Sequence, residues 1–188
     1  MKKCMYIVEG EIEERFLQQL KQLGLVVPGK VFTFNLMQKQ LKYTSNILAF
    51  KNYSAIYCVV DTDVVDEGNI GNLVQNIKLL KPIGKPRILV QNKNFEDELM
   101  RILELPNIAA LGKLLGAKQN DVRWVKRFLS QNIDYSKHIN RDNIVRYCSR
   151  YHSFQELLNN KKCGIDNLVC GYEAVSYTHL TLPTNSRV

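Results

Sequence analysis

The sequence predicts an α/β protein: a parallel sheet of about four strands flanked by helices, followed by a helical C-terminal part. Short apolar runs recur along the first hundred residues, and segments with apolar residues every three or four positions separate them. These are the patterns of buried strands and of helices packed on a core. Strands that alternate with helices form parallel sheets, and a strand that is apolar throughout, such as residues 55–60, is typical of their centre.

The expected elements alternate regularly up to residue 105. Strands are predicted at residues 4–8, 31–36, 55–60 and 87–91. Helices are predicted at residues 11–23, 38–50 and 70–80, with a turn at residues 66–69 before the third. Asn94 is a good N-cap for a helix after the fourth strand. Beyond Pro106 the pattern is helical only, over residues 108–115, 120–131 and 142–159.

These patterns divide the chain into an α/β domain at residues 1–105 and a helical extension of the same domain at residues 106–174. The last fourteen residues, 175–188, contain no acidic residue but many Thr and Ser. They resemble the translated adaptor sequence that occurs at the ends of reading frames in raw sequencing assemblies. We therefore expect a non-native tail there and leave it out of the fold prediction.

Composition favours one domain in the cytoplasm. The chain has 188 residues, of which 45% are hydrophobic, enough for one sizeable core. No apolar run approaches the ~18 residues of a membrane span, so we expect no membrane part. Lys2 and Lys3 precede only a short apolar run before Glu9, so we expect no signal peptide here. The five cysteines are odd in number and two lie in predicted strands, which indicates reduced thiols rather than disulfides. The spacing of Cys148, His152, Cys163 and Cys170 matches no common zinc module.

Acidic residues follow two of the predicted strands. Glu9 comes directly after strand 4–8, and Asp61 and Asp63 come after strand 55–60. Ligands of open α/β sheets bind at the carboxyl ends of strands, so these side chains can converge on one site. Like charges so close need a cation or shifted pKa values. Mg²⁺ is the simplest cation because it takes carboxylate oxygens, water and phosphate, and Mn²⁺ is an alternative.

Each acidic motif also has a plain structural interpretation. Glu9 can bind metal or act as a general acid or base, or it can only stabilise the first turn of the next helix. Asp61 and Asp63 share one face of an extended chain and can reach one cation, or they can form a turn. Glu96 and Glu98 can add further carboxylates, or they can lie in water on a capped helix.

The net charge of +8 contrasts with the acidic strand ends, so the surplus Lys and Arg must lie elsewhere on the surface. That distribution suits a polyanion held by a basic surface. Arg123, Trp124, Lys126 and Arg127 form a basic helical stretch with one aromatic residue, which can grip phosphates and stack a base. In the alternative interpretation Trp124 packs inward and the charges are solvated.

The order of a strand followed by Glu-Gly and a strand followed by Asp-x-Asp resembles the TOPRIM (topoisomerase–primase) domain, a Rossmann-like three-layer fold. Residues 8–17, VEGEIEERFL, resemble the "E-G-x-T-E-x-x-F" opening of the RloB-like and OLD-type branches, with Ile12 where Thr is usual. Residues 92–96, NKNFE, resemble the "S-N-P-x-F-E" segment of RloB-like proteins, with Gln91 in place of Ser and Lys93 in place of Pro.

The resemblance implies Mg²⁺-dependent phosphodiester chemistry in which Glu9, Asp61 and Asp63 are the catalytic residues. Glu9 takes the role of general acid or base, while the two aspartates hold metal. Glu13 and Glu96 match further carboxylates of the RloB-like pattern. The implied metal ligands are Glu9, Glu13, Asp61, Asp63 and Glu96. RloB-like and OLD-type proteins are linked with phage defence, so the resemblance implies a defence nuclease that acts on DNA or RNA, with a partner ATPase as an option.

Two other classes of function stay open from the sequence. A domain of this kind can bind nucleic acid or a partner without cutting. An Asp-x-Asp pair can also serve a phosphohydrolase, with Asp61 as nucleophile, as in haloacid-dehalogenase-like enzymes. Those enzymes normally carry the pair after their first strand, whereas here it follows the third predicted strand.

Overall fold

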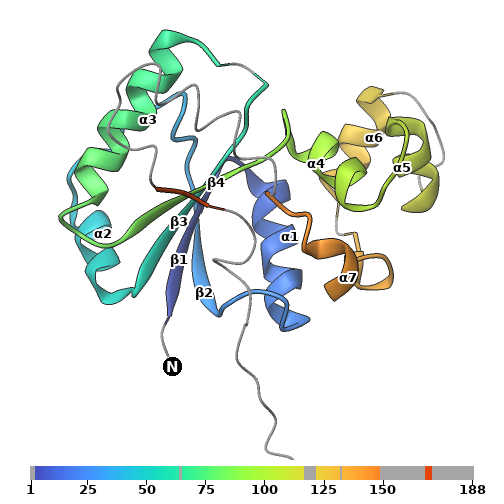
Figure 1. The fold of residues 1–188 in the computed structure, drawn as a ribbon, viewed down its shortest axis with the longest axis horizontal. Coiled ribbons are helices and arrows are strands. Elements are labelled where there is room, and N and C mark those ends of the chain that lie inside the picture. Colours follow the sequence, from blue (N-terminus) through green and yellow to red (C-terminus); the bar gives the residue numbers. More distant parts are fainter. Residues whose placement is uncertain (1–2, 64, 117–121, 132, 149–167, 171–188) are drawn as a thin grey trace, which may run out of the picture.

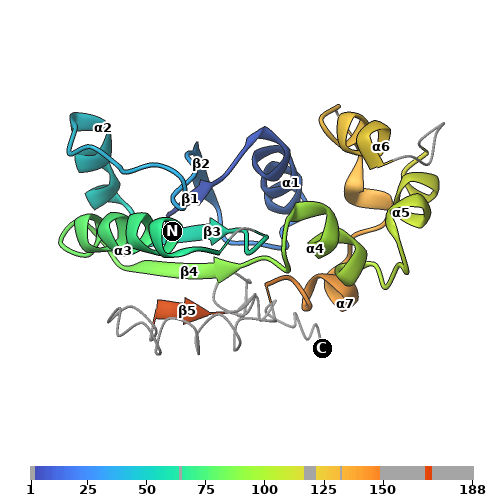
Figure 2. The same cartoon turned by 90° about the horizontal axis from the view of Figure 1, so that it is seen from above.

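Parallel strands run through the centre of the molecule, with helices on both faces (Figures 1 and 2). A computed structural model describes residues 3–63, 65–116, 122–131, 133–148 and 168–170. Within these residues the sheet has five strands in the order β2-β1-β3-β4-β5, and each neighbouring pair is parallel. The strands are β1 (Cys4–Val8), β2 (Gly29–Thr33), β3 (Ala55–Val60), β4 (Pro86–Val90) and β5 (Val169–Cys170). The predicted α/β fold class is confirmed.

The helices divide between the two faces of the sheet. The described helices are α1 (Glu11–Gln22), α2 (Ser45–Leu48), α3 (Glu67–Leu80), α4 (Phe95–Ile102), α5 (Ile108–Leu114), α6 (Val122–Leu129) and α7 (Arg141–Ile144), with 3₁₀ turns η1 (Ala49–Asn52) and η2 (Tyr135–Lys137). Tyr6 and Tyr57 belong to the core on the side of α1 and the C-terminal helices. Ile7 and Ile56 belong to the core on the side of α3. Because side chains alternate across a strand, the sheet builds two cores and three layers.

Strands β1 and β3 match the predicted ranges, and every residue in them is buried. Strand β2 begins and ends earlier than the predicted residues 31–36. Its register on β1 pairs Gly29 with Cys4 and Thr33 with Val8. A Cβ at position 29 would lie 2.3 Å from the carbonyl oxygen of Cys4, so the close approach of the two strands requires glycine there.

The helix predicted at residues 38–50 is wrong in its first half: only α2 and η1 are helical. The buried side chain of Asn76, on α3, accepts a hydrogen bond from the N–H of Leu41 and donates to the carbonyls of Leu36 and Lys39. These bonds satisfy backbone groups that a helix would otherwise pair. A distant asparagine therefore holds this segment in an irregular conformation.

The C-terminal helices lie beside α1 rather than over the middle of the sheet (Figure 1). Two side chains of α1 hold the chain that follows α6. Arg15 donates to the carbonyl of Ser130, and the Gln19 amide donates to the carbonyl of Ile133 and accepts from the N–H of Tyr135. The helical part therefore packs directly on the helix that begins at the first acidic motif.

Three outcomes concern this part of the chain. The helices predicted at residues 108–115 and 120–131 appear as α5 and α6. A continuous helix over residues 142–159 is wrong, because Cys148 has a φ of 53° and its N–H donates to Glu98 Oε1 over 2.6 Å. Strand β5 was not predicted. Residues 149–167 and the expected non-native tail lie outside the described residues.

Candidate functional site

The first acidic motif is built by the turn from β1 into α1. Glu9 directly follows β1, and Gly10 is the N-cap of α1 but has no side chain to cap it. Glu13 lies in the first turn of α1, and a Cβ at position 10 would lie 3.3 Å from its Oε2 atom, so this carboxylate sits beside the start of the helix. Glu13 is buried, and burial raises its pKa, with a further contribution from the charge of Glu96.

The second acidic motif follows β3, the neighbour of β1. Asp61 is mostly buried at the strand end, while Asp63 is exposed. Burial raises the pKa of Asp61 to about 9, and the negative charges of Glu9, Glu13, Asp63 and Glu96 add to that increase. Burial likewise raises the pKa of Glu9 to about 7, with contributions from Glu13 and Asp63. The five carboxylates that the sequence singled out therefore lie within electrostatic range of one another.

The donor set at this site is compatible with a hard cation. All five groups are carboxylates, and the buried Oδ1 of Asp61 has no hydrogen-bond partner in the described part of the chain. An unpaired buried oxygen surrounded by like charges is the environment that Mg²⁺ stabilises. Among the described residues, however, no three His, Cys, Asp or Glu side chains are arranged as ligands of one metal ion. The carboxylates share one region without forming a ready-made coordination sphere.

The loop that carries the two aspartates is fastened to the next strand end by Thr62. Its hydroxyl donates to the carbonyl of Gln91 over 3.0 Å and accepts from the N–H of Lys93 over 3.0 Å. Its own N–H donates to the Lys93 carbonyl over 2.6 Å. Lys93 adopts a left-handed backbone, with a φ of 60°. The middle residue of Asp61-Thr62-Asp63 therefore fixes the two acids on either side of it.

The two glutamates of α4 have different roles. Glu96 is buried and lies near the other carboxylates, as its contribution to the pKa of Asp61 indicates. Glu98 is fully buried and is paired with Arg101 at 2.5 Å. It also accepts from the N–H groups of Asn92 and Cys148, over 2.9 Å and 2.6 Å. Glu98 is therefore a structural anchor for the start of α4 and the end of the helical part.

The predicted nucleic-acid-binding residues lie on α6. Arg123, Lys126 and Arg127 are exposed. The ammonium group of Lys126 lies 3.8 Å from Glu96 Oε1, so this helix borders the acidic site. Trp124 is half-buried and stacks on Phe128 with ring centroids 5.2 Å apart. Trp124 is thus partly packed, as the alternative interpretation expected, while the basic side chains face solvent.

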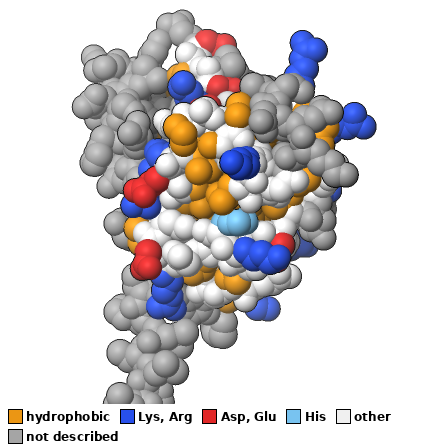
Figure 3. All heavy atoms as spheres, turned by 90° about the vertical axis from the view of Figure 1, so that its right-hand side faces the viewer, with side chains coloured by type: hydrophobic (Ala, Val, Ile, Leu, Met, Phe, Trp, Pro, Cys, Tyr) orange, Lys and Arg blue, Asp and Glu red, His pale blue; other side chains and the backbone are white. Residues whose placement is uncertain are grey.

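Helices α4 to α7 lie on the right-hand side of the molecule in Figure 1, and Figure 3 shows that side face-on. Hydrophobic side chains form an area there that Lys and Arg side chains border. The exposed fractions of Leu114 and Val145 are 39% and 55%. Residues 106–148 carry eight Lys or Arg against three Asp or Glu, which is five of the eight net positive charges of the chain. Positive charge is therefore concentrated in the helical part.

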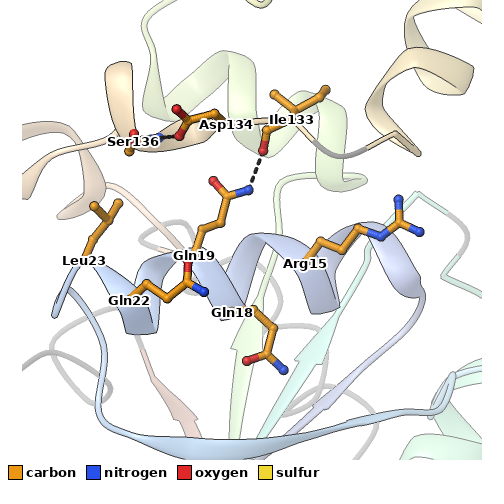
Figure 4. A pocket seen from close by; sticks show the side chains of 8 residues that line it. All are labelled: Arg15, Gln18, Gln19, Gln22, Leu23, Ile133, Asp134 and Ser136. Atoms are coloured by element: carbon orange, nitrogen blue, oxygen red, sulfur yellow. Dashed lines mark hydrogen bonds between the residues drawn. The ribbon is translucent and has the colours of Figure 1, made fainter.

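A polar cleft of about 460 Å³ lies elsewhere, between α1 and the segment at residues 133–136 (Figure 4). Gln19 crosses it to reach the carbonyl of Ile133, and Asp134 accepts from the N–H of Ser136. The five carboxylates of the acidic site do not line this cleft. It marks the junction between the α/β part and the helical part.

Sequence reasoning missed three residues of the site: Thr62, Gln91 and Tyr135. Gln91 and Tyr135 are almost completely buried, yet Oε1 of Gln91 and the hydroxyl of Tyr135 lack a hydrogen-bond partner among the described residues. Tyr135 lies near the acids, because Glu13 and Glu96 both act electrostatically on its hydroxyl. The sequence gives no local sign of these roles, since each depends on contacts between distant segments.

Comparisons of the chain with protein-family models, with curated proteins and with solved structures found no match. The resemblance to TOPRIM domains therefore stays a hypothesis that rests on the motifs. Among the described residues, none of the helices has the length and apolar character needed to cross a membrane.

Proposed function

We propose that this protein is a Mg²⁺-dependent nuclease that hydrolyses phosphodiester bonds of DNA or RNA, with Mn²⁺ as a substitute ion. The observation that carries the proposal is the convergence of five carboxylates from three separate segments at the carboxyl ends of adjacent parallel strands. Burial together with the neighbouring negative charges raises the pKa values of Glu9, Glu13 and Asp61, which is the expected cost of such an arrangement when no positive charge offsets it. A bound cation would offset this unfavourable energy, so the arrangement of the carboxylates suits a cation site.

Each carboxylate has a task in this proposal. Asp61, Asp63, Glu13 and Glu96 would hold the ion, which when bound would polarise a phosphate oxygen and activate water. Glu9 would move the proton, because a carboxyl with a pKa of about 7 can both accept and donate at neutral pH. The Asp-x-Asp pair follows β3 rather than the first strand of the chain, which argues against the phosphohydrolase alternative.

The basic helical part supports nucleic acid as the substrate. A polyanion is attracted to the positive charge of residues 106–148. Lys126 brings one of these charges to the edge of the acidic site, where it would contact a phosphate. Arg123 and Arg127 would hold the strand further along. The aromatic pair of Trp124 and Phe128 offers a partly exposed ring surface for a base.

The motif resemblance extends the proposal to biological context. An RloB-like or OLD-type TOPRIM protein would take part in phage defence, and a partner ATPase would be in keeping with that role. The buried cysteines Cys4, Cys58 and Cys148 form no disulfide within the described part of the chain, which supports the expected cytoplasmic location.

One observation favours a second function, that of a non-catalytic binding module for nucleic acid or a partner protein. Among the described residues the carboxylates do not form a metal-ligand group. A domain that keeps the acidic residues after its strands but does not bind a metal ion would still present the basic helix α6.

A cleavage assay separates the two functions. Single- and double-stranded DNA and RNA are incubated with the protein in Mg²⁺, Mn²⁺ or EDTA, beside an Asp61→Asn/Asp63→Asn double variant. Asp66→Asn is the matched control, because Asp66 is an exposed N-cap that asparagine replaces well. We expect cation-dependent cleavage by the wild type and the control, and none by the double variant. Equal, salt-sensitive binding by all three without cleavage would instead support the binding module.

A further inference from the structure

Three buried side-chain polar atoms lack a hydrogen-bond partner among the described residues: Asp61 Oδ1, Gln91 Oε1 and the hydroxyl of Tyr135. Buried polar groups are normally paired, so each of these atoms needs an explanation. Asp61 belongs to the acidic site, Gln91 follows the adjacent strand β4, and Tyr135 acts electrostatically with Glu13 and Glu96. Asp61 and Gln91 follow neighbouring strands and their unpaired atoms are acceptors, whereas Tyr135 carries the unpaired hydroxyl donor of the three.

Tyr135 is held rigidly in this position. Its N–H donates to Gln19 Oε1 over 2.7 Å, and the same amide binds the carbonyl of Ile133, as Figure 4 shows. Its ring packs edge-on against Phe16, with centroids 5.2 Å apart and planes at 86°. Phe16 lies one helical turn after Glu13 on α1. Only 2% of Tyr135 is exposed, so bulk water does not satisfy the hydroxyl.

The carboxylates near the hydroxyl do not satisfy it either. The ring of Phe16 contacts both Tyr135 and Phe95, the residue before Glu96, with centroids 5.2 Å apart in each pair, so Tyr135 lies beside the segments that carry Glu13 and Glu96. Burial raises the pKa of Tyr135, and the charges of both acids add to that increase. Neither forms a hydrogen bond with it. A buried donor that makes no hydrogen bond with the acceptors beside it can be satisfied by one additional oxygen atom.

We propose that Tyr135 is a further residue of the site, whose hydroxyl donates a hydrogen bond to an oxygen held near Glu13 and Glu96. That oxygen is either water on the bound cation or a phosphate oxygen of the substrate. The inference rests on the proposed nuclease function. It gives the helical part a second role besides binding the strand, because η2 delivers a side chain to the reacting region.

Tyr135→Phe tests the proposal, since it removes only the hydroxyl. Tyr6→Phe is the matched control: Tyr6 is another buried tyrosine, and its hydroxyl donates to the carbonyl of Val27 over 2.7 Å. Thermal unfolding is followed in EDTA, in a Mn²⁺ titration, and in an inorganic phosphate titration at saturating Mn²⁺. The shifts of the unfolding midpoint give the apparent affinities for both ligands.

In EDTA we expect Tyr135→Phe to unfold at the wild-type temperature or above, because no hydrogen bond is lost, and Tyr6→Phe to unfold below it. We expect Tyr135→Phe to bind Mn²⁺ about tenfold more weakly if its partner is cation-bound water. It will bind phosphate about tenfold more weakly, with Mn²⁺ affinity unchanged, if the partner is a phosphate oxygen. Tyr6→Phe should keep both affinities.

Wild-type affinity of Tyr135→Phe for both ligands would overturn the inference and leave the nuclease proposal intact. A loss of stability in EDTA equal to that of Tyr6→Phe would also overturn it, because the hydroxyl would then have a protein partner. If the wild type itself fails to respond to Mn²⁺, the proposed function fails and the inference fails with it.

Discussion

Asp61 is half-buried beside four other acids, and its Oδ1 atom is shielded from solvent, so its charged form is unfavourable in the folded protein. Its pKa is about 9 when folded, against 3.8 for an ordinary aspartate. Between those values the folded state binds a proton that the unfolded state has released, so stability falls as pH rises. Glu9 adds to the same effect between its ordinary pKa of 4.5 and about 7.

Replacement of Asp61 by asparagine should therefore stabilise the protein at alkaline pH in EDTA. Between pH 5 and pH 8, one proton bound only by the folded state changes the free energy of unfolding by at most ~4 kcal/mol. Asp61 is partly solvated, so we expect a gain of about 1–2 kcal/mol at pH 8 and a smaller gain at pH 5. Urea denaturation at pH 5 and pH 8 measures this gain in the free energy of unfolding, and Asp66→Asn should leave the free energy of unfolding unchanged at both pH values. Equal pH dependence in the wild type and Asp61→Asn would contradict the assigned pKa.

The two glutamates of α4 give a paired test of structural and functional roles. Glu98→Ala leaves Arg101 and two buried N–H groups without their partner, and should destabilise the protein by about 3 kcal/mol. Glu96→Ala loses only a 3.8 Å contact with the half-exposed Lys126 and relieves repulsion at Asp61. It should change stability by less than ~1 kcal/mol. Chemical denaturation in EDTA compares them, and equal losses would mean that the two roles are assigned wrongly.

At the scale of loops and strands, Thr62 connects the ends of β3 and β4. Thr62→Val keeps the shape of the side chain but loses both hydroxyl bonds, at a cost of about 1–2 kcal/mol. It should also weaken Mn²⁺ binding or cleavage by about tenfold, because the adjacent aspartates lose their fixed positions. Thr62→Ser keeps the hydroxyl and should restore both properties. Unchanged Mn²⁺ binding and cleavage by Thr62→Val would show that the loop does not need this fastening.

The elements that sequence predicted well are those whose signal is local. Strands β1 and β3 are apolar at nearly every position because both faces are covered, and their ranges are correct. Residues 38–44 lie outside any helix because Asn76, on α3, binds backbone groups on either side of Lys39. Nothing in the sequence of this segment predicts a hydrogen-bond partner more than thirty residues away.

The same distinction applies to the site. The acids after β1 and β3 could be predicted to converge, because adjacent parallel strands end at the same edge. Glu96 and Glu98 could not be told apart, since only the tertiary contacts of Glu98 with Arg101 and Cys148 show that it is structural. Tyr135 could not be found at all, because its place depends on how η2 packs against α1.

At the scale of the whole molecule, the acids meet at the end of the sheet and α6, which borders them, presents exposed cations. Binding to a 20-nucleotide strand should therefore weaken steeply as salt rises. Arg123→Ala and Arg127→Ala should each reduce the slope of log K against log salt concentration by about one. Lys51→Ala is the control and should leave the slope unchanged, because η1 directly follows α2, which lies on the opposite side of Figure 1 from α6. Equal slopes for all variants would exclude α6 as the contact surface.

Strand β5 has a consequence for how the protein is made. It pairs with β4, yet Val169 lies roughly 80 residues after the end of β4 at Val90. At typical rates of about 5–20 residues per second, the ribosome needs roughly 4–16 seconds to reach it. During that interval the outer edge of β4 is an open strand, which can pair with a neighbouring nascent chain. Misassembly of the protein should therefore be most frequent on polysomes that translate its messenger RNA slowly.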